Sequence, residues 1–157
     1  MAAAGGAEPA FVVRRWKAEQ LEEEHLRLLY LMSKYTSETT WVRELPLLVL
    51  LYEAIRKDVF SYDYAPDCVS VGDRVVFMNI SQEGRDDIDD LREAGLLDSL
   101  KLTTYSGVTM TALKLSPAGR AFTVNVKPED KDIVDAVFQP PGVERPTEVL
   151  WTGDNSR

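Results

Sequence analysis

The sequence predicts a single α+β domain from three observations. The chain has 157 residues, enough for one domain with a buried core. Apolar residues recur three and four apart in several separate segments, which indicates amphipathic helices. Between them lie short runs of alternating polarity, two of which flank Ser106-Gly107, a turn signal for a β-hairpin. We therefore expect several helices around a small antiparallel β-sheet.

Composition restricts the class of protein. Acidic residues outnumber basic residues by 26 to 18, so the net charge is −8. A protein of this charge is repelled by nucleic acid and by anionic membranes unless a local basic patch overrides the average. The longest apolar run, Leu45 to Tyr52, is far shorter than the about 20 residues that a membrane-spanning helix needs. We expect a soluble protein with no membrane partner.

The chain contains one cysteine, Cys68. A single cysteine excludes an internal disulfide framework and is typical of a reducing compartment. We therefore expect an intracellular, cytoplasmic protein, with the nucleus as an alternative. Unpaired cysteines are most often small, partly buried apolar residues, and this is the expectation for Cys68.

The N-terminal third predicts a tail and two helices. The first ten residues are small and uncharged apart from Glu8, so residues 1–12 are expected to form a flexible tail. Over residues 13–35 the apolar periodicity indicates an amphipathic helix with His25 on its apolar side. A second helix is expected to begin near Glu44 and Pro46, which suit a first turn, and to be the core helix, because it is apolar on nearly every side.

The middle of the chain predicts one strand and one helix. Residues 61–73 contain proline, glycine and aspartates and are typical of turns. Residues 74–81 are rich in valine, phenylalanine and isoleucine and predict a strand. After a short loop, a helix is expected to start near Asp86 and to stop at Gly95.

The following segment predicts a hairpin and two helices. Strands 99–105 and 108–115 are expected to flank a two-residue turn. Ser116 and Pro117 are typical of the cap and first turn of a helix. A last helix is predicted over residues 127–138, where an apolar face follows an acidic first turn.

The domain organisation follows from these elements. Residues 13–138 are expected to form one domain after the flexible tail. Residues 139–157 form a proline-containing C-terminal extension with a candidate strand at 147–152. No internal repeat is present in the sequence.

Residues 86–122 contain the phrases LREAGL (residues 91–96) and LSPAGR (residues 115–120) on either side of the predicted hairpin. This arrangement resembles the winged-helix superfamily, as in regulators of the MarR and PadR kind. Such proteins carry a recognition helix ending in Leu-x-x-x-Gly-Leu, then a β-hairpin wing, then Leu-Thr-x-x-Gly-Arg. The matching residues are Leu91, Gly95 and Leu96, followed by Leu115, Ser116, Gly119 and Arg120. The resemblance implies an α+β fold with a winged-helix-like core, made of helices plus a small antiparallel β-sheet and wing, and flanking N- and C-terminal helices. It does not specify function, because the same scaffold serves DNA reading and protein contacts.

The segment departs from this pattern in two ways. Winged helices usually place a short helix before the recognition helix, whereas only SQEGR separates the predicted strand from the predicted helix. Over residues 82–99, seven acidic residues stand against two basic ones. Asp86 and Asp87 at the expected helix start would face DNA phosphates directly, which is unfavourable.

The acidic helix favours a protein-interaction or assembly subunit. We expect a partner protein, which could be basic, in a homodimer or a hetero-assembly, and we do not expect nucleic acid. The candidate contact residues on the acidic face are Asp86, Asp87, Asp90 and Glu93. The alternative is a winged-helix DNA-binding regulator that uses a wing and a basic N-terminal segment. Its candidate contacts are Lys101, Tyr105, Gly107 and Lys114 in the wing, and Arg14, Arg15 and Lys17 before it.

Catalytic motifs are missing from the sequence. It contains no Gly-rich phosphate-binding loop and no nucleophile elbow. One histidine and one cysteine are too few for a Cys/His metal site. We expect a non-enzymatic protein with no cofactor and no metal. A pocket that held His25 or Cys68 beside an acidic residue would favour an enzyme instead.

Overall fold

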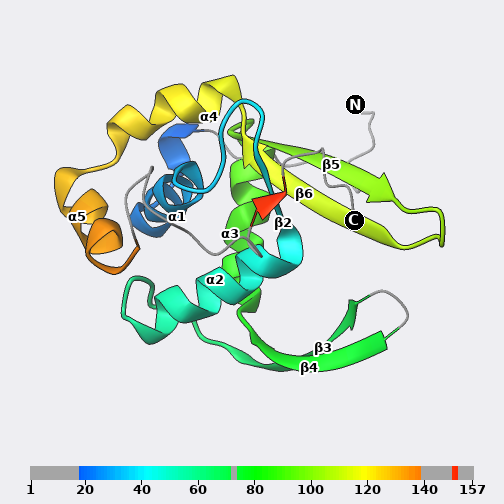
Figure 1. Ribbon diagram of the computed structural model, residues 1–157. Helices are drawn as coiled ribbons and strands as arrows, with labels where there is room; N and C mark the ends of the chain where they lie inside the picture. The colour runs from blue at the N-terminus through cyan, green and yellow to red at the C-terminus, as the bar shows by residue number, and fades with distance from the viewer. Residues whose placement is uncertain (1–17, 72–73, 139–149, 152–157) are drawn as a thin grey trace, which may run out of the picture.

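Three helices form the centre of the molecule: α1 (Glu23–Ser33), α2 (Glu44–Arg56) and α3 (Gln82–Glu93). The computed structural model describes residues 18–71, 74–138 and 150–151. The three helices lie against one another in Figure 1 and share one apolar core. Fully buried members of this core include Leu28, Leu29, Met32, Leu47, Leu51 and Leu91. The α+β fold class predicted from the sequence is confirmed, since helices combine with small antiparallel sheets.

The first helix is shorter than the sequence predicted. A 3₁₀ turn, η2 (Ala18–Gln20), precedes α1, and residues 13–17 lie outside the described part of the chain. The backbone N–H of Glu22, just before the helix, donates to Nδ1 of His25 at 3.0 Å. This hydrogen bond satisfies a backbone donor at the helix start and explains why α1 begins here.

The second helix confirms its prediction. Pro46 lies in the first turn of α2, where its missing N–H has no intrahelical role. Leucines on several sides of α2 are buried, as expected for a helix in the middle of a core. Among the described helices none is long and apolar enough to cross a membrane.

The turn-rich segment contains a strand that the sequence did not predict. β3 (Ala65–Val71) pairs antiparallel with β4 (Arg74–Ile80), which is the strand expected near residues 74–81. Together they form a separate two-stranded sheet. Pro66 is tolerated because β3 has a partner on one side only.

The helix predicted from Asp86 starts four residues earlier, at Gln82. Ser81 is its N-cap, and its Oγ accepts a hydrogen bond from the backbone N–H of Gly84 at 3.0 Å. A Cβ on Gly84 would lie 2.3 Å from Leu51 Cδ2, so glycine allows α3 to approach α2 closely. The predicted stop is confirmed, because Gly95 follows the helix with φ +82°.

The main sheet has the order β5-β6-β2-β7 and is antiparallel throughout. β5 (Leu97–Thr103) and β6 (Thr109–Leu115) form the predicted hairpin, but the turn is not a two-residue turn, because residues 104–108 connect the last pair. β2 (Trp41–Arg43) pairs with β6 and with β7 (Leu150–Trp151). Of the candidate strand at 147–152, only β7 lies within the described residues.

The segment after the hairpin is held by Ser116. Its backbone N–H donates to the carbonyl of Leu96, and its Oγ donates to the carbonyl of Gly95 at 2.7 Å. The same Oγ caps α4 (Pro117–Phe122), as predicted, by accepting from the N–H of Gly119. A Cβ on Gly119 would lie 2.0 Å from the Leu96 carbonyl oxygen. The two phrases that carry the family resemblance therefore touch each other.

A short 3₁₀ turn, η3 (Thr123–Asn125), leads to α5 (Pro128–Val137), which confirms the last predicted helix. Arg27 of α1 holds α5 in place, because its Nη2 donates to Oδ1 of the buried Asp130 at 2.6 Å. The Nη1 of Arg27 donates to the carbonyl of Val59 at 2.6 Å. Lys34, the C-cap residue of α1, and Asp135 of α5 form a second ion pair.

Candidate functional site

The two β-hairpins extend from the same side of the helical body (Figure 1). On the β3–β4 hairpin, Val75 is 66% exposed to solvent and Phe77 is 76% exposed. Residues two apart on a strand point to the same face, so these two side chains form one apolar strip. Their pairing partners across the hairpin are Ser70 and Cys68. An exposed apolar strip of this kind is typical of a surface that contacts another molecule.

The β5–β6 hairpin bears a further exposed aromatic residue. Tyr105 in its connecting loop is fully exposed, and Gly107 in the same loop adopts φ +89°, a conformation that suits glycine. Lys101 is exposed on β5. Lys114, by contrast, is held on the protein: its Nζ donates to the carbonyl of Glu38 at 2.6 Å and lies over the ring of Trp41. The four predicted wing residues therefore do not share one free surface.

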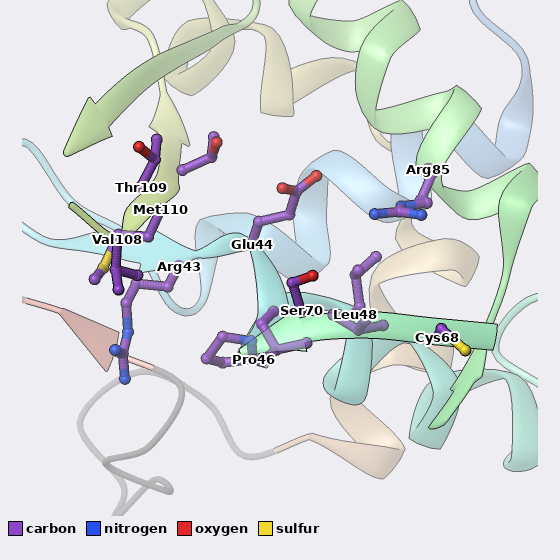
Figure 2. A pocket seen from close by; sticks show the side chains of 13 residues that line it. Arg43, Glu44, Pro46, Leu48, Cys68, Ser70, Arg85, Val108, Thr109 and Met110 are labelled. Carbon is purple, nitrogen blue, oxygen red and sulfur yellow. The ribbon is translucent and has the colours of Figure 1, made fainter. Parts of the chain in front are cut away.

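A cavity of about 500 Å³ lies between the two hairpins. The start of α2 and one residue of α3 close it, as Figure 2 shows. Its apolar wall consists of side chains from α2 and from both hairpins, namely Leu45, Pro46, Leu48, Val69, Val108 and Met110. A cavity of this size, with apolar walls and few charged groups, fits a ligand or a peptide side chain.

Three charged residues line this cavity: Arg43, Glu44 and Arg85. In Figure 2 the Glu44 carboxylate and the Arg85 guanidinium point toward the space between them, while Arg43 points away from both. All three side chains are half-buried. Nε of Arg43 is buried without a hydrogen-bond partner. Within the described part of the chain, none of the three side chains forms a hydrogen bond or an ion pair.

Cys68 also lines the cavity, but it is exposed, so the expectation of a partly buried cysteine is wrong. Among the described strands, β3 pairs with β4 alone, and it does not pack inside the main core, which is why the thiol reaches the surface. Figure 2 shows Cys68 at the far end of the cavity from Glu44. The thiol and the carboxylate therefore do not form a nucleophile–base pair.

His25 lies in a separate, buried cluster between α1 and α3. Its Nε2 is 2.9 Å from Asp90 Oδ2 and 3.3 Å from Asp87 Oδ1. The hydroxyl of Tyr62 donates to Asp87 Oδ2 at 2.5 Å. Burial and this hydrogen bond raise the pKa of Tyr62 above its ordinary value of 10, so the phenol remains a donor at neutral pH.

The ring nitrogens of His25 have opposite roles. Nδ1 accepts from the backbone of Glu22, so the proton of the neutral ring resides on Nε2, between the two aspartates. Burial lowers the pKa of His25, but the hydrogen bonds and charges of Asp87 and Asp90 outweigh it, and the pKa is raised above 6.5. Although the three ligand atoms lie within 4.8 Å of one another, Nε2 has no free lone pair for a metal ion in this tautomer.

The four residues of the predicted acidic face do not lie on one surface of α3. Asp86 and Glu93 are exposed, whereas Asp87 and Asp90 are half-buried and directed to His25. Because α3 starts at Gln82, Asp86 and Asp87 lie in its second turn and not at its N-terminus. The predicted basic contacts Arg14, Arg15 and Lys17 lie outside the described residues.

A family model described as "Uncharacterized protein MJ1567 family" matches residues 24–157. The chain belongs to this family. The family match includes both hairpins, the cavity and the His25 cluster. Comparison with curated proteins found no match, and comparison with solved structures found none either.

Sequence reasoning missed the cavity and the partners of His25. The cavity joins residues from five elements, so no local pattern indicates it. The sequence around Asp87 does, however, indicate that its side chain points inward. Gly84, Ile88 and Leu91 form the buried side of α3, and a residue four positions before Leu91 falls on that same side.

Proposed function

We propose that this chain is a non-enzymatic protein-interaction module built on a winged-helix scaffold. The observation that carries the proposal is the apolar strip of Val75 and Phe77, exposed beside an apolar cavity. Removing apolar surface from water is favourable, so a partner that covers these side chains gains affinity, and aromatic residues are enriched at protein interfaces. The partner is a protein, and the exposed cysteine suits a reducing intracellular compartment.

The order of elements supports the winged-helix part of the proposal. α1, β2, α2, α3 and the β5–β6 hairpin follow in the order helix, strand, helix, helix, wing, and β2 pairs with the second strand of the wing. The helix that such a scaffold needs before its recognition helix is α2. The β3–β4 hairpin separates the two helices in sequence, which is why the SQEGR stretch looked too short.

The described residues do not favour DNA reading by α3. Its exposed side carries Asp86, Asp89 and Glu93, and Arg92 on that side is paired with Asp89. Phosphates would meet carboxylates there, and such like-charge contacts cost several kcal/mol. The acidic charge of α3 therefore agrees with the proposed protein-interaction function. In this proposal the partner contacts the hairpin side of the molecule and not α3.

The test compares the wild-type chain with the double variant Val75→Ser/Phe77→Ser. Each is immobilised and exposed to extract of the native source, and retained proteins are identified by mass spectrometry. We expect a specific set of proteins on the wild type and its loss on the variant. Val124→Ser is the matched control, because Val124 is also exposed but lies in η3, away from the hairpins.

Two results would contradict the proposal. One is equal retention by the wild type and the double variant. The other is tight, salt-dependent binding of random duplex DNA, which would favour a DNA-binding regulator.

A further inference from the structure

The cavity adjoins an edge of the main sheet that no described strand pairs with. β6 pairs with β5 from Thr109 to Leu115, but its pairing with β2 covers only Ala112 and Leu113. β2 ends at Arg43, where the chain turns into α2. No described strand therefore pairs with the second edge of β6 over Thr109–Thr111, and these residues line the cavity. Backbone donors and acceptors at such an edge are available to an added strand.

Within the described chain, the charged groups of the cavity differ from other half-buried charged groups because they have no partner. The other buried or half-buried cations each contact a carboxylate, a carbonyl or an aromatic ring; they are Arg27, Lys34, Lys114, Arg120 and Lys131. Arg43 and Arg85 have no such contact, although the chain carries an excess of carboxylates. Glu44, opposite Arg85, is also unpaired. Half-burial without a partner is unfavourable, so a ligand that supplies the partners gains affinity.

The chemistry of the ligand follows from these groups. A guanidinium binds a carboxylate best, through two parallel hydrogen bonds. The Glu44 carboxylate requires a cation or an N–H donor. Leu48, Pro46 and Met110, which also line the cavity, favour an apolar group. The free edge of β6 requires an extended backbone. An extended peptide that carries an acidic, an apolar and a basic residue at alternate positions, so that all three side chains share one face, meets all four requirements.

We propose that this cavity binds such a peptide segment of a partner protein, which adds as a strand to β6 beyond the end of β2. Its acidic side chain pairs with Arg85 and its basic side chain with Glu44. This inference rests on the proposed function, since it names the segment that the interaction module recognises.

The experiment uses a random peptide library displayed on phage, selected against the full chain. We expect enriched peptides that contain an acidic and a basic residue around an apolar residue. Synthetic copies are then titrated by fluorescence polarisation. Arg85→Ala and Glu44→Gln should each weaken binding at least about tenfold, the loss of one charge-assisted contact. Arg92→Ala, an exposed arginine of the same helix, is the matched control and should bind like the wild type.

Two further peptides sharpen the test. A peptide with its acidic and basic residues exchanged should bind the double variant Glu44→Arg/Arg85→Glu better than the wild type. A peptide N-methylated at alternate backbone positions should lose binding, because an added strand needs those N–H groups.

Several outcomes would overturn the inference. They are a selection without enrichment, enriched peptides without the charge pattern, unchanged binding by Arg85→Ala, and full binding by the N-methylated peptide. If peptides or extract proteins depend on Val75 and Phe77 but not on Arg85, this inference fails while the proposed function stands. The selected peptides could instead show the expected charge pattern while the wild type and the Val75→Ser/Phe77→Ser variant retain the same extract proteins. In that case the inference about the cavity stands, and the apolar strip is not the contact surface.

Discussion

The helical side and the hairpin side of the molecule differ in how their charged groups are satisfied. Between α1, α3 and α5, the buried residues His25, Lys34 and Asp130 each have a charged partner. Between the hairpins, Glu44 and Arg85 line a cavity without a partner among the described residues. Paired buried charges fix how helices pack, whereas unpaired half-buried charges contribute little to folding and are available for binding. We propose that one side stabilises the fold and that the other side binds the partner.

The largest expected effect comes from removing Arg27. The variant Arg27→Ala leaves the carboxylate of Asp130 buried without its cation, and breaking such a pair costs about 3 kcal/mol of unfolding free energy. Urea unfolding followed by circular dichroism measures this value. Arg92→Ala, which breaks an exposed pair, should cost less than about 0.5 kcal/mol. If both variants lost a similar, small amount of unfolding free energy, the Arg27–Asp130 pair would not stabilise the helical side as we infer.

An intermediate effect depends on pH and concerns His25. Since its folded-state pKa is raised above 6.5, its stabilising interaction is fully present below that value and is lost as pH rises through the folded pKa. The difference in unfolding free energy between the wild type and His25→Gln should therefore be larger at about pH 6 than at about pH 9. A difference that stays constant or grows with pH would contradict the pairing with Asp87 and Asp90.

The smallest expected effect comes from Arg85→Ala. Among the described residues this arginine has no partner to lose, so the unfolding free energy should change by less than about 0.5 kcal/mol. The same urea experiment compares it directly with Arg27→Ala, because both remove one half-buried arginine. A loss above about 1 kcal/mol would mean that Arg85 stabilises the fold, and the contrast between the two sides would disappear.

Much of the fold could be predicted because its signals are local. Pro46, Ser116 with Pro117, and Gly95 mark helix boundaries through their own backbone preferences, and the structure confirms each of them. The helix start at Gln82 was missed because Gly84 resembles a loop residue. Glycine is needed there by Leu51 of another helix, and that requirement is not visible in a local pattern.

The candidate site could be predicted much less well. His25 and Asp90 are 65 positions apart in the chain, so only the packing of α1 on α3 brings them together. The strand β3 was missed because its proline, cysteine and serine do not resemble a buried strand. It forms because β4 beside it supplies the pairing, and this pairing also creates one wall of the cavity.

The contact between Ser116 and the Gly95-Leu96 corner has a consequence for how the chain folds. Its hydrogen bonds join residues about twenty positions apart. They close a loop that contains the β5–β6 hairpin, with α3 ending just before the loop and α4 starting just after it. Contacts of short sequence separation form with little loop-closure entropy and early in folding. We therefore expect residues 81–122 to fold as the first unit. β2 and α1 then dock onto a sheet edge and a helix face that already exist.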